Sequence, residues 1–71
     1  MKDEVLIRLG KEIKKRRIDI GISREELSKR SGYSLSFIGY IERGERNLSI
    51  KTLLEISKAL DNAELIFFVE K

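Results

Sequence analysis

Apolar residues recur at helical spacing through the first third of the chain. Leu6, Leu9 and Ile13 are separated by three and four residues, which is the spacing of one face of an amphipathic helix. Gly21 follows this segment and is typical of the residue just past a helix end. We therefore expect a first helix from about residue 3 to residue 20, the longest element of the chain.

Capping residues predict a second, shorter helix. Ser23 and Glu26 have the spacing of a capping box, in which the serine side chain accepts from the backbone N–H three residues further on. Gly32 stands where a left-handed residue ends a helix. This helix should span about residues 24–31.

Serine residues also mark the start of two further helices. Ser34 is the expected N-cap of a third helix, which Gly44 closes. Ser49 starts a fourth helix. Its apolar residues are expected to face inward: Ile50, Leu53, Leu54, Ile56, Ala59 and Leu60.

An unbroken apolar run lies near the end of the sequence, at Leu65, Ile66, Phe67, Phe68 and Val69. Periodicity does not distinguish a short strand from one or two helical turns in so short a run. So many large apolar residues favour a surface that pairs with a second copy of itself. We interpret residues 63–71 as a dimerisation tail and the five apolar residues as the homodimer interface.

The chain has 71 residues and contains no proline, no linker rich in glycine and serine, and no internal repeat. These features indicate one domain over residues 1–71 with an all-α fold, a compact bundle of four to five short helices. A domain of this size buries only about 60% of the surface that its unfolded chain exposes. Self-association is therefore an expected source of additional stability.

The composition excludes several kinds of chemistry. The chain has neither cysteine nor histidine, so it can form no disulfide, no zinc site with these ligands and no Cys/His nucleophile system. A core this small also leaves no room for a substrate pocket of about 300 Å³. We therefore expect no enzyme activity, no cofactor, no metal and no small-molecule ligand.

The charge is mildly positive. Lys and Arg number 15 against 12 Asp and Glu, which gives a net charge of +3. The excess suits a nucleic-acid binder and is concentrated in "KEIKKRR" and "RGERN". No run approaches the apolar length of about 18 residues that spans a membrane. The start "MKDEVLIRLGKE" lacks the apolar segment of a signal peptide, so we expect a cytoplasmic, nucleoid-associated protein.

The third helix is expected to have two different faces. At about 100° per residue, Ile38 and Ile41 fall on the buried arc with Glu42 on one flank. Phe37 lies on the other flank, where core packing and contact with a partner are equally open. The opposite arc carries Ser36, Gly39, Tyr40 and Arg43 in place of the Lys/Glu coat of a solvated helix. Two short helices joined through Gly32, the second with such an outer face, form a helix-turn-helix signature.

The sequence resembles the helix-turn-helix domains of the Cro and phage-repressor type (XRE-like). The resemblance covers about residues 9–60, with matching positions at Gly21, Leu27, Gly32, Ile38, Ile41, Glu42 and Gly44. The stretch "ERGERNLSIKTLLEISKALDNAELIFF" is most similar to the controller proteins of bacterial restriction-modification systems, which are dimeric regulators of their own operons. The resemblance implies a lambda-repressor-like fold, a short fifth helix in the tail, and binding to double-stranded DNA.

The resemblance assigns base contacts to the start of the third helix, because the N-terminal part of a recognition helix enters the major groove. Serine hydroxyls read donors or acceptors, and apolar side chains press on the thymine methyl group. Leu35 departs from the polar residue that the family frequently has there, so no operator sequence can be transferred. For Tyr40 a phosphate or sugar contact is favoured. The expected base-contacting residues are Ser34, Leu35, Ser36, Phe37, Gly39 and Tyr40.

Basic and polar residues near the third helix are expected on the DNA backbone. Arg24 opposes the dipole of the second helix unless an anion is near, and the family commonly has a backbone-contacting glutamine there. The expected backbone-contacting residues are Arg24, Arg43, Arg46, Asn47, Ser49 and Lys51. A solvated basic rim is the alternative for each cation. The resemblance also implies a partly buried salt bridge between Arg17 and Glu42.

The sequence thus predicts a sequence-specific transcriptional regulator that binds an inverted-repeat operator as a homodimer. Its two recognition helices should lie about 34 Å apart, in successive major grooves. The alternative is an antitoxin or another protein-interaction module, in which the apolar C-terminal tail blocks a partner and DNA binding is secondary or lost.

Overall fold

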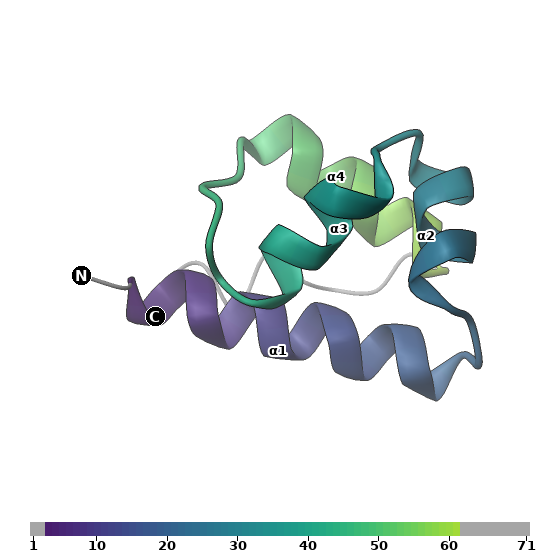
Figure 1. Cartoon of the computed structure of the whole chain (residues 1–71), viewed down its shortest axis with the longest axis horizontal. Coiled ribbons are helices and arrows are strands. Elements are labelled where there is room, and N and C mark those ends of the chain that lie inside the picture. Colours follow the sequence, from purple (N-terminus) through teal and green to yellow (C-terminus); the bar gives the residue numbers. More distant parts are fainter. Residues whose placement is uncertain (1–2, 62–71) are drawn as a thin grey trace.

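The computed structural model describes residues 3–61, which form four α-helices (Figure 1). They are α1 (Glu4–Asp19), α2 (Arg24–Ser31), α3 (Leu35–Glu42) and α4 (Ile50–Ala59). The described residues contain no strand. The predicted all-α fold is therefore confirmed, and the helix bounds agree closely with those expected from the sequence.

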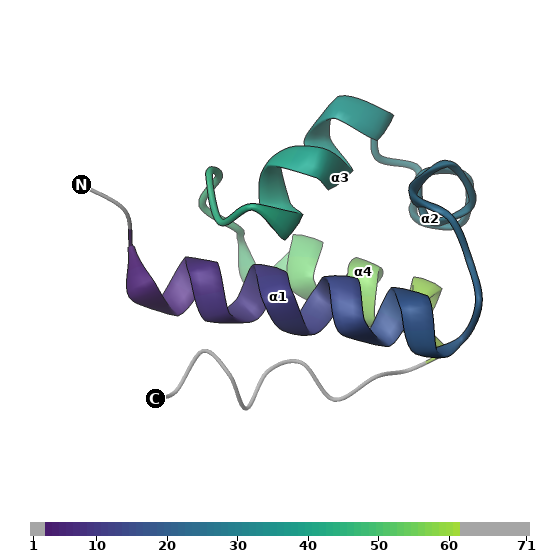
Figure 2. The ribbon, with the colours of Figure 1, turned by 60° about the horizontal axis from the view of Figure 1, so that its bottom comes forward.

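The long helix α1 extends along one side of the molecule, and the shorter helices pack on it and on one another (Figure 1). α3 packs against both α1 and α2, and α2 also packs against α4. In Figure 2, α2 is seen end-on beside the start of α3. Residues 32–34 join these two helices, so α2 and α3 form the expected helix-turn-helix unit.

Side-chain caps explain where the helices begin. The Asp3 carboxylate accepts the backbone N–H two residues further on at 2.8 Å and starts α1. The hydroxyls of Ser23, Ser34 and Ser49 each accept the N–H three residues further on, at 3.0 to 3.1 Å. Gly32 ends α2 with a left-handed φ of 81°. Each cap satisfies backbone groups that the helix itself leaves unpaired.

The core is small and aliphatic, and all four helices contribute to it. Its buried residues are Leu9, Ile13, Leu27, Ile38, Ile41, Leu53, Ile56, Ala59 and Leu60. Half-buried apolar side chains surround it, namely Ile20, Ile22, Tyr33, Phe37 and Leu48. Full burial of an aliphatic side chain of this size stabilises the folded state by about 1.5 to 3 kcal/mol.

The inward face of α4 is narrower than its sequence suggests. Leu53 and Ile56 are buried, but Ile50 is 58% exposed and Leu54 is 51% exposed. The prediction that Ile50 and Leu54 face inward is therefore wrong. A step of about 100° per residue turns Leu54 away from the arc that holds Leu53. The described helices cover that arc and leave the neighbouring apolar flank of α4 uncovered.

A close contact between α1 and α3 explains a glycine that the hydrophobic pattern does not. A Cβ atom at Gly10 would lie 2.4 Å from the carbonyl oxygen of Ile41 and 2.7 Å from that of Glu42. These distances are shorter than any carbon–oxygen contact can be, so only glycine allows the two backbones to approach so closely. Gly10 thereby fixes the position of α3 on α1.

The apolar run at residues 65–69 and the fifth helix expected in the tail lie outside the described residues. The assignment of residues 63–71 as a dimerisation tail therefore stays a prediction.

Candidate nucleic-acid interface

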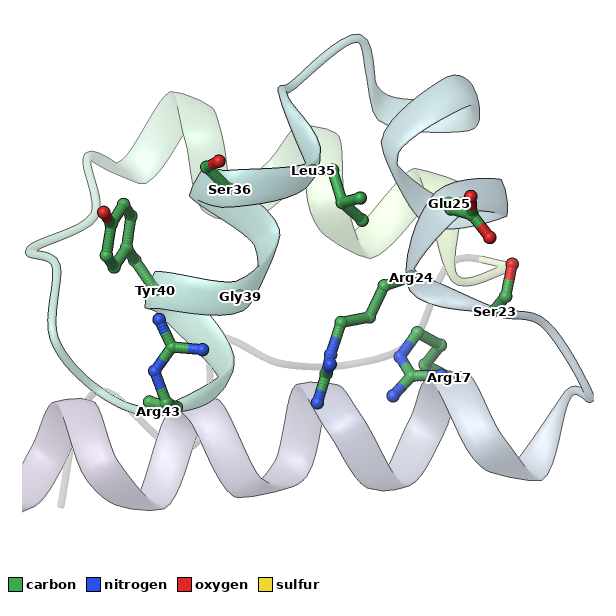
Figure 3. A pocket seen from close by; sticks show the side chains of 9 residues that line it. All are labelled: Arg17, Ser23, Arg24, Glu25, Leu35, Ser36, Gly39, Tyr40 and Arg43. Atoms are coloured by element: carbon green, nitrogen blue, oxygen red, sulfur yellow. The ribbon is translucent and has the colours of Figure 1, made fainter.

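A groove of about 570 Å³ opens on the surface where α1, α2 and α3 meet (Figure 3). Side chains from the end of α1, the start of α2 and the outer face of α3 line it: Arg17, Ser23, Arg24, Glu25, Leu35, Ser36, Gly39, Tyr40 and Arg43. The lining includes three guanidinium groups and one carboxylate, so the groove favours an anion. The sequence predicted no room for a pocket of about 300 Å³ in so small a core. This groove is larger because it lies on the surface between helices and not in the core.

The start of α3 presents short side chains to solvent. Leu35 is 48% exposed, and Ser34 and Ser36 are also exposed. The Ser34 oxygen accepts the Phe37 N–H at 3.1 Å as the helix cap, which leaves the hydroxyl hydrogen available to donate. Figure 3 shows the Leu35 and Ser36 side chains at this first turn, with Leu35 pointing toward α2. They are therefore placed where a ligand that approaches α3 would meet them.

Two of the residues expected to contact bases are not on open surface. Phe37 is half-buried and packs on the core, with its ring centroid 5.1 Å from that of Tyr33. Core packing of Phe37 is therefore present in the structure, and its contact with DNA stays a prediction. Gly39 was expected on the open outer arc but is buried. A Cβ atom there would lie 3.1 Å from Arg43 Nη1, because the Arg43 side chain covers this position.

An ion triad holds α3 to the two preceding helices. Arg17 Nε donates to Glu42 Oε2 at 2.7 Å, and Arg17 Nη1 donates to the carbonyl oxygen of Ile22 at 2.9 Å. Arg24 Nε donates to the second oxygen, Glu42 Oε1, at 2.9 Å. The Glu42 side chain is only 1% exposed, whereas that of Arg24 is 45% exposed. One buried carboxylate thus binds two guanidinium groups and leaves a net positive charge at the groove.

The partner of Arg24 was missed by sequence reasoning. An arginine at a helix N-terminus was expected to need a nearby anion, and Glu42 supplies one from 18 positions further along the chain. Arg17 was expected only in the salt bridge, and it is present there and also lines the groove. Ser23 and Glu25 were not expected at the site. The only available signal was their position at the N-cap and in the first turn of α2, the helix that precedes α3.

A second basic cluster lies at the other end of α3. The guanidinium carbons of Arg43 and Arg46 lie 5.3 Å and 5.4 Å from the centroid of the Tyr40 ring. Arg43 Nε also donates to Glu45 Oε1 at 3.1 Å. Arg43 and Tyr40 line the groove, and Figure 3 shows them next to each other. Both distances are within the range of cation–π attraction, which extends to about 6 Å.

The other residues expected on the DNA backbone follow this cluster along the chain. Asn47 is exposed, and its side-chain oxygen accepts the Leu48 N–H at 3.0 Å. Ser49 caps α4, and Lys51 is exposed in the first turn of that helix. None of these three residues, nor Arg46, lines the groove. They extend the polar surface beyond the groove, along the connection from α3 to α4.

Within residues 3–61, no helix has the length and apolar character needed to cross a membrane.

The fold and this surface define a helix-turn-helix protein. The helix-turn-helix family model matches residues 13–66, and the chain therefore belongs to this family of DNA-binding transcription regulators. The helix-turn-helix resemblance noted in the sequence is confirmed.

Individual relatives narrow the similarity to controller proteins. The chain is 36% identical to an uncharacterised helix-turn-helix transcriptional regulator, y4dJ, of Sinorhizobium fredii, over 73% of this chain and 68% of that protein. It is 40% identical to the control protein C.SmaI of Serratia marcescens, over 59% of this chain and 50% of that protein.

Solved structures give the same result. The wild-type restriction-modification controller protein C.Esp1396I has a TM-score of 0.85 and 36% identity, with 94% of this chain and 87% of that chain covered. The controller protein C.AhdI of Aeromonas hydrophila has a TM-score of 0.81 and 35% identity, with 89% and 94% covered. The C.Esp1396I tetramer in complex with its natural 35 base-pair operator has a TM-score of 0.84 and 33% identity, with 99% and 100% covered.

Proposed function

We propose that the protein is a sequence-specific transcriptional regulator of the controller-protein type, which binds double-stranded DNA as a homodimer on an inverted-repeat operator. The observation that carries this proposal is the outer face of α3. Leu35, Ser36 and Tyr40 face a groove that Arg24 and Arg43 border. Hydroxyl, apolar and cationic groups are thereby presented on one surface, which is the combination that base edges and phosphates require.

The relatives support DNA as the partner. C.Esp1396I was crystallised with its operator as a tetramer and also on duplexes of 25 and 19 base pairs. The structural match to the operator-bound tetramer covers 99% of this chain, with a TM-score of 0.84. Duplex DNA is therefore the ligand that we propose for the groove and for the face of α3.

The proposed contacts divide into two kinds. Base edges are assigned to the start of α3, through Ser34, Leu35 and Ser36. Phosphate contacts are assigned to Arg24, Arg43, Arg46, Asn47, Ser49 and Lys51. Phosphate contacts set affinity and orientation, whereas base contacts decide which sequence is bound.

The proposed homodimer rests on apolar surface. Ile50 and Leu54 expose more than half of their area on one flank of α4, shortly before the apolar run in the sequence. A dimer that reads two successive major grooves on one side of a duplex must hold its two α3 helices about 34 Å apart. Occupancy of the operator would then follow the monomer–dimer equilibrium and rise more than linearly with protein concentration.

Selection of bound fragments from a random duplex library tests the proposal directly. We expect enrichment of one motif with two-fold symmetry and a centre-to-centre spacing of about 10 base pairs. Enrichment of a single asymmetric half-site would contradict the homodimer. Recovery of the starting sequence distribution would contradict sequence-specific binding altogether.

The Arg46→Ala variant tests the assignment to the backbone. We expect weaker binding to every sequence alike, and a slope of log affinity against log salt concentration that is less steep by about 0.9, because one phosphate contact is lost. Lys11→Ala is the matched control, since Lys11 is an exposed cation of α1 outside the groove. An equal effect of both substitutions would show that Arg46 acts only through net charge.

The same library experiment also tests the alternative, a protein-interaction module. Its support is the exposure of Ile50, Leu54 and Ile18, the last of which is 57% exposed. A co-purified toxin-like partner, together with no selected DNA motif, would favour it. We also propose that the chain has no catalytic activity, because its sequence lacks both histidine and cysteine.

A further inference from the structure

We propose that Tyr40 and Gly39 are positioning residues that hold the guanidinium groups of Arg43 and Arg46 in a single ordered cluster before DNA is bound. This inference rests on the proposed function, because it assigns how the phosphate-contacting arginines of that site are organised. It also replaces a base-reading role for Tyr40 with a role inside the protein.

Contacts with one aromatic ring connect the two arginines. Their guanidinium carbons lie 5.3 Å and 5.4 Å from the Tyr40 centroid, although the two residues are three positions apart in the loop after α3. Like charges would otherwise keep two exposed guanidinium groups apart. The electron-rich face of the ring attracts both cations and so brings them together.

Two further contacts restrict Arg43. Its Nε donates to Glu45 Oε1 at 3.1 Å. Its guanidinium lies along the backbone at Gly39, where a Cβ atom would be 3.1 Å from Nη1 and 3.8 Å from Cζ. A Cβ atom at position 39 would be in tight contact with this guanidinium and would displace it by a few tenths of an ångström. Glycine disfavours a helix interior, and at this position it leaves the guanidinium in place.

An ordered cluster is useful for binding phosphates. A long arginine side chain loses rotamer freedom when it is fixed in a complex, and this loss weakens binding. Arginine side chains that are already fixed in the free protein lose less rotamer freedom on binding. The cluster should therefore raise the affinity for every DNA sequence without the addition of any contact to the DNA.

Variants of Tyr40 separate this role from direct contact. We expect Tyr40→Leu to weaken binding about tenfold for all sequences, because two rotamer-rich side chains must then be ordered on binding. The salt slope should stay that of the wild-type protein, since both arginines still reach phosphates in the complex. Tyr40→Phe keeps the ring and should bind like the wild-type protein. A changed sequence preference, or equal losses in Tyr40→Phe and Tyr40→Leu, would refute the inference.

Coupling to the arginines gives a second test. In a protein that carries both Arg43→Ala and Arg46→Ala, the Tyr40→Leu substitution should have no further effect on affinity. A tenfold effect that persists in this background would mean that Tyr40 acts through DNA. Gly39→Ala should displace the Arg43 guanidinium and weaken DNA binding about threefold. The midpoint of thermal unfolding should stay unchanged or rise, because alanine favours a helix more than glycine does.

The isolated protein provides a test that does not depend on DNA. Ring currents should shift the side-chain proton NMR signals of Arg43 and Arg46 in the wild-type protein and in Tyr40→Phe. The shifts should vanish in Tyr40→Leu, with backbone amide signals outside residues 39–47 unchanged as a control for folding. Absence of duplex binding by the wild-type protein would refute the proposed function. Arginine signals that do not respond to loss of the ring would refute this inference alone.

Discussion

The two ends of α3 are attached to the rest of the molecule by different kinds of contact. At the C-terminal end, the buried carboxylate of Glu42 accepts hydrogen bonds from Arg17 of α1 and Arg24 of α2. At the N-terminal end, Tyr33 lies in the turn before α3. Its hydroxyl donates to Glu55 Oε1 of α4 at 2.5 Å and lies 3.1 Å from Thr52 Oγ1. One end is held by buried charge and the other by the hydroxyl of a half-buried tyrosine.

The difference suits the proposed function. Buried ion pairs are screened by salt much less than exposed ones, so the Glu42 end should keep its position over the ionic strengths at which DNA affinity changes steeply. The Tyr33 end adjoins Ser34, where α3 would enter the major groove. Contacts there attach the turn before α3 to α4 through the Tyr33 hydroxyl and the Glu55 carboxylate.

The largest expected effect comes from loss of the charge at the C-terminal end. Glu42→Ala leaves the Arg17 guanidinium buried without its carboxylate, and we expect it to lower the free energy of unfolding by about 3 to 5 kcal/mol. Urea denaturation measures this change. The matched control is Glu26→Ala, whose ion pair with Arg30 is well exposed, with an expected change below about 1 kcal/mol. Equal losses in both variants would contradict the view that Glu42 anchors α3.

A smaller effect is expected when only the exposed half of the triad is removed. Arg24→Ala leaves the Arg17–Glu42 pair intact, and the Arg24 side chain is 45% exposed. We expect the free energy of unfolding to fall by about 1 kcal/mol or less, and this difference to shrink at high salt. DNA affinity should fall for all sequences alike. Unchanged affinity in a titration with duplex DNA would assign Arg24 to the fold alone.

Much of this arrangement was predictable because it depends on local sequence. Ser23, Ser34 and Ser49 act within three residues of themselves, so the helix starts could be read directly. Contacts between different helices could not be predicted from local sequence. The exposure of Leu54 depends on which side of α4 the other helices cover. The pairing of Arg24 with Glu42 and the close contact at Gly10 depend on how α1, α2 and α3 approach one another.

The smallest expected effect concerns the N-terminal end and depends on pH. The hydrogen bond to the Glu55 carboxylate raises the pKa of the Tyr33 hydroxyl above its usual value of 10.0, since a phenolate could not donate this bond and would be repelled by the carboxylate. A raised pKa stabilises the folded state below the pKa of the unfolded chain. This contribution should be constant from pH 7 to about pH 9 and should be lost as the pH rises through the folded-state pKa.

Tyr33→Phe tests this end of the comparison. We expect the variant to be slightly less stable than the wild-type protein at neutral pH, with a difference that narrows above about pH 10, as followed by guanidinium denaturation at a series of pH values. Other titrating groups are common to both proteins and cancel in the difference. Tyr40→Phe is the control at pH 7, where we expect no change, because none of the hydrogen bonds among residues 3–61 involves its hydroxyl. Equal stability of Tyr33→Phe and the wild-type protein at neutral pH would show that the ring, and not its hydroxyl, attaches the start of α3 to α4.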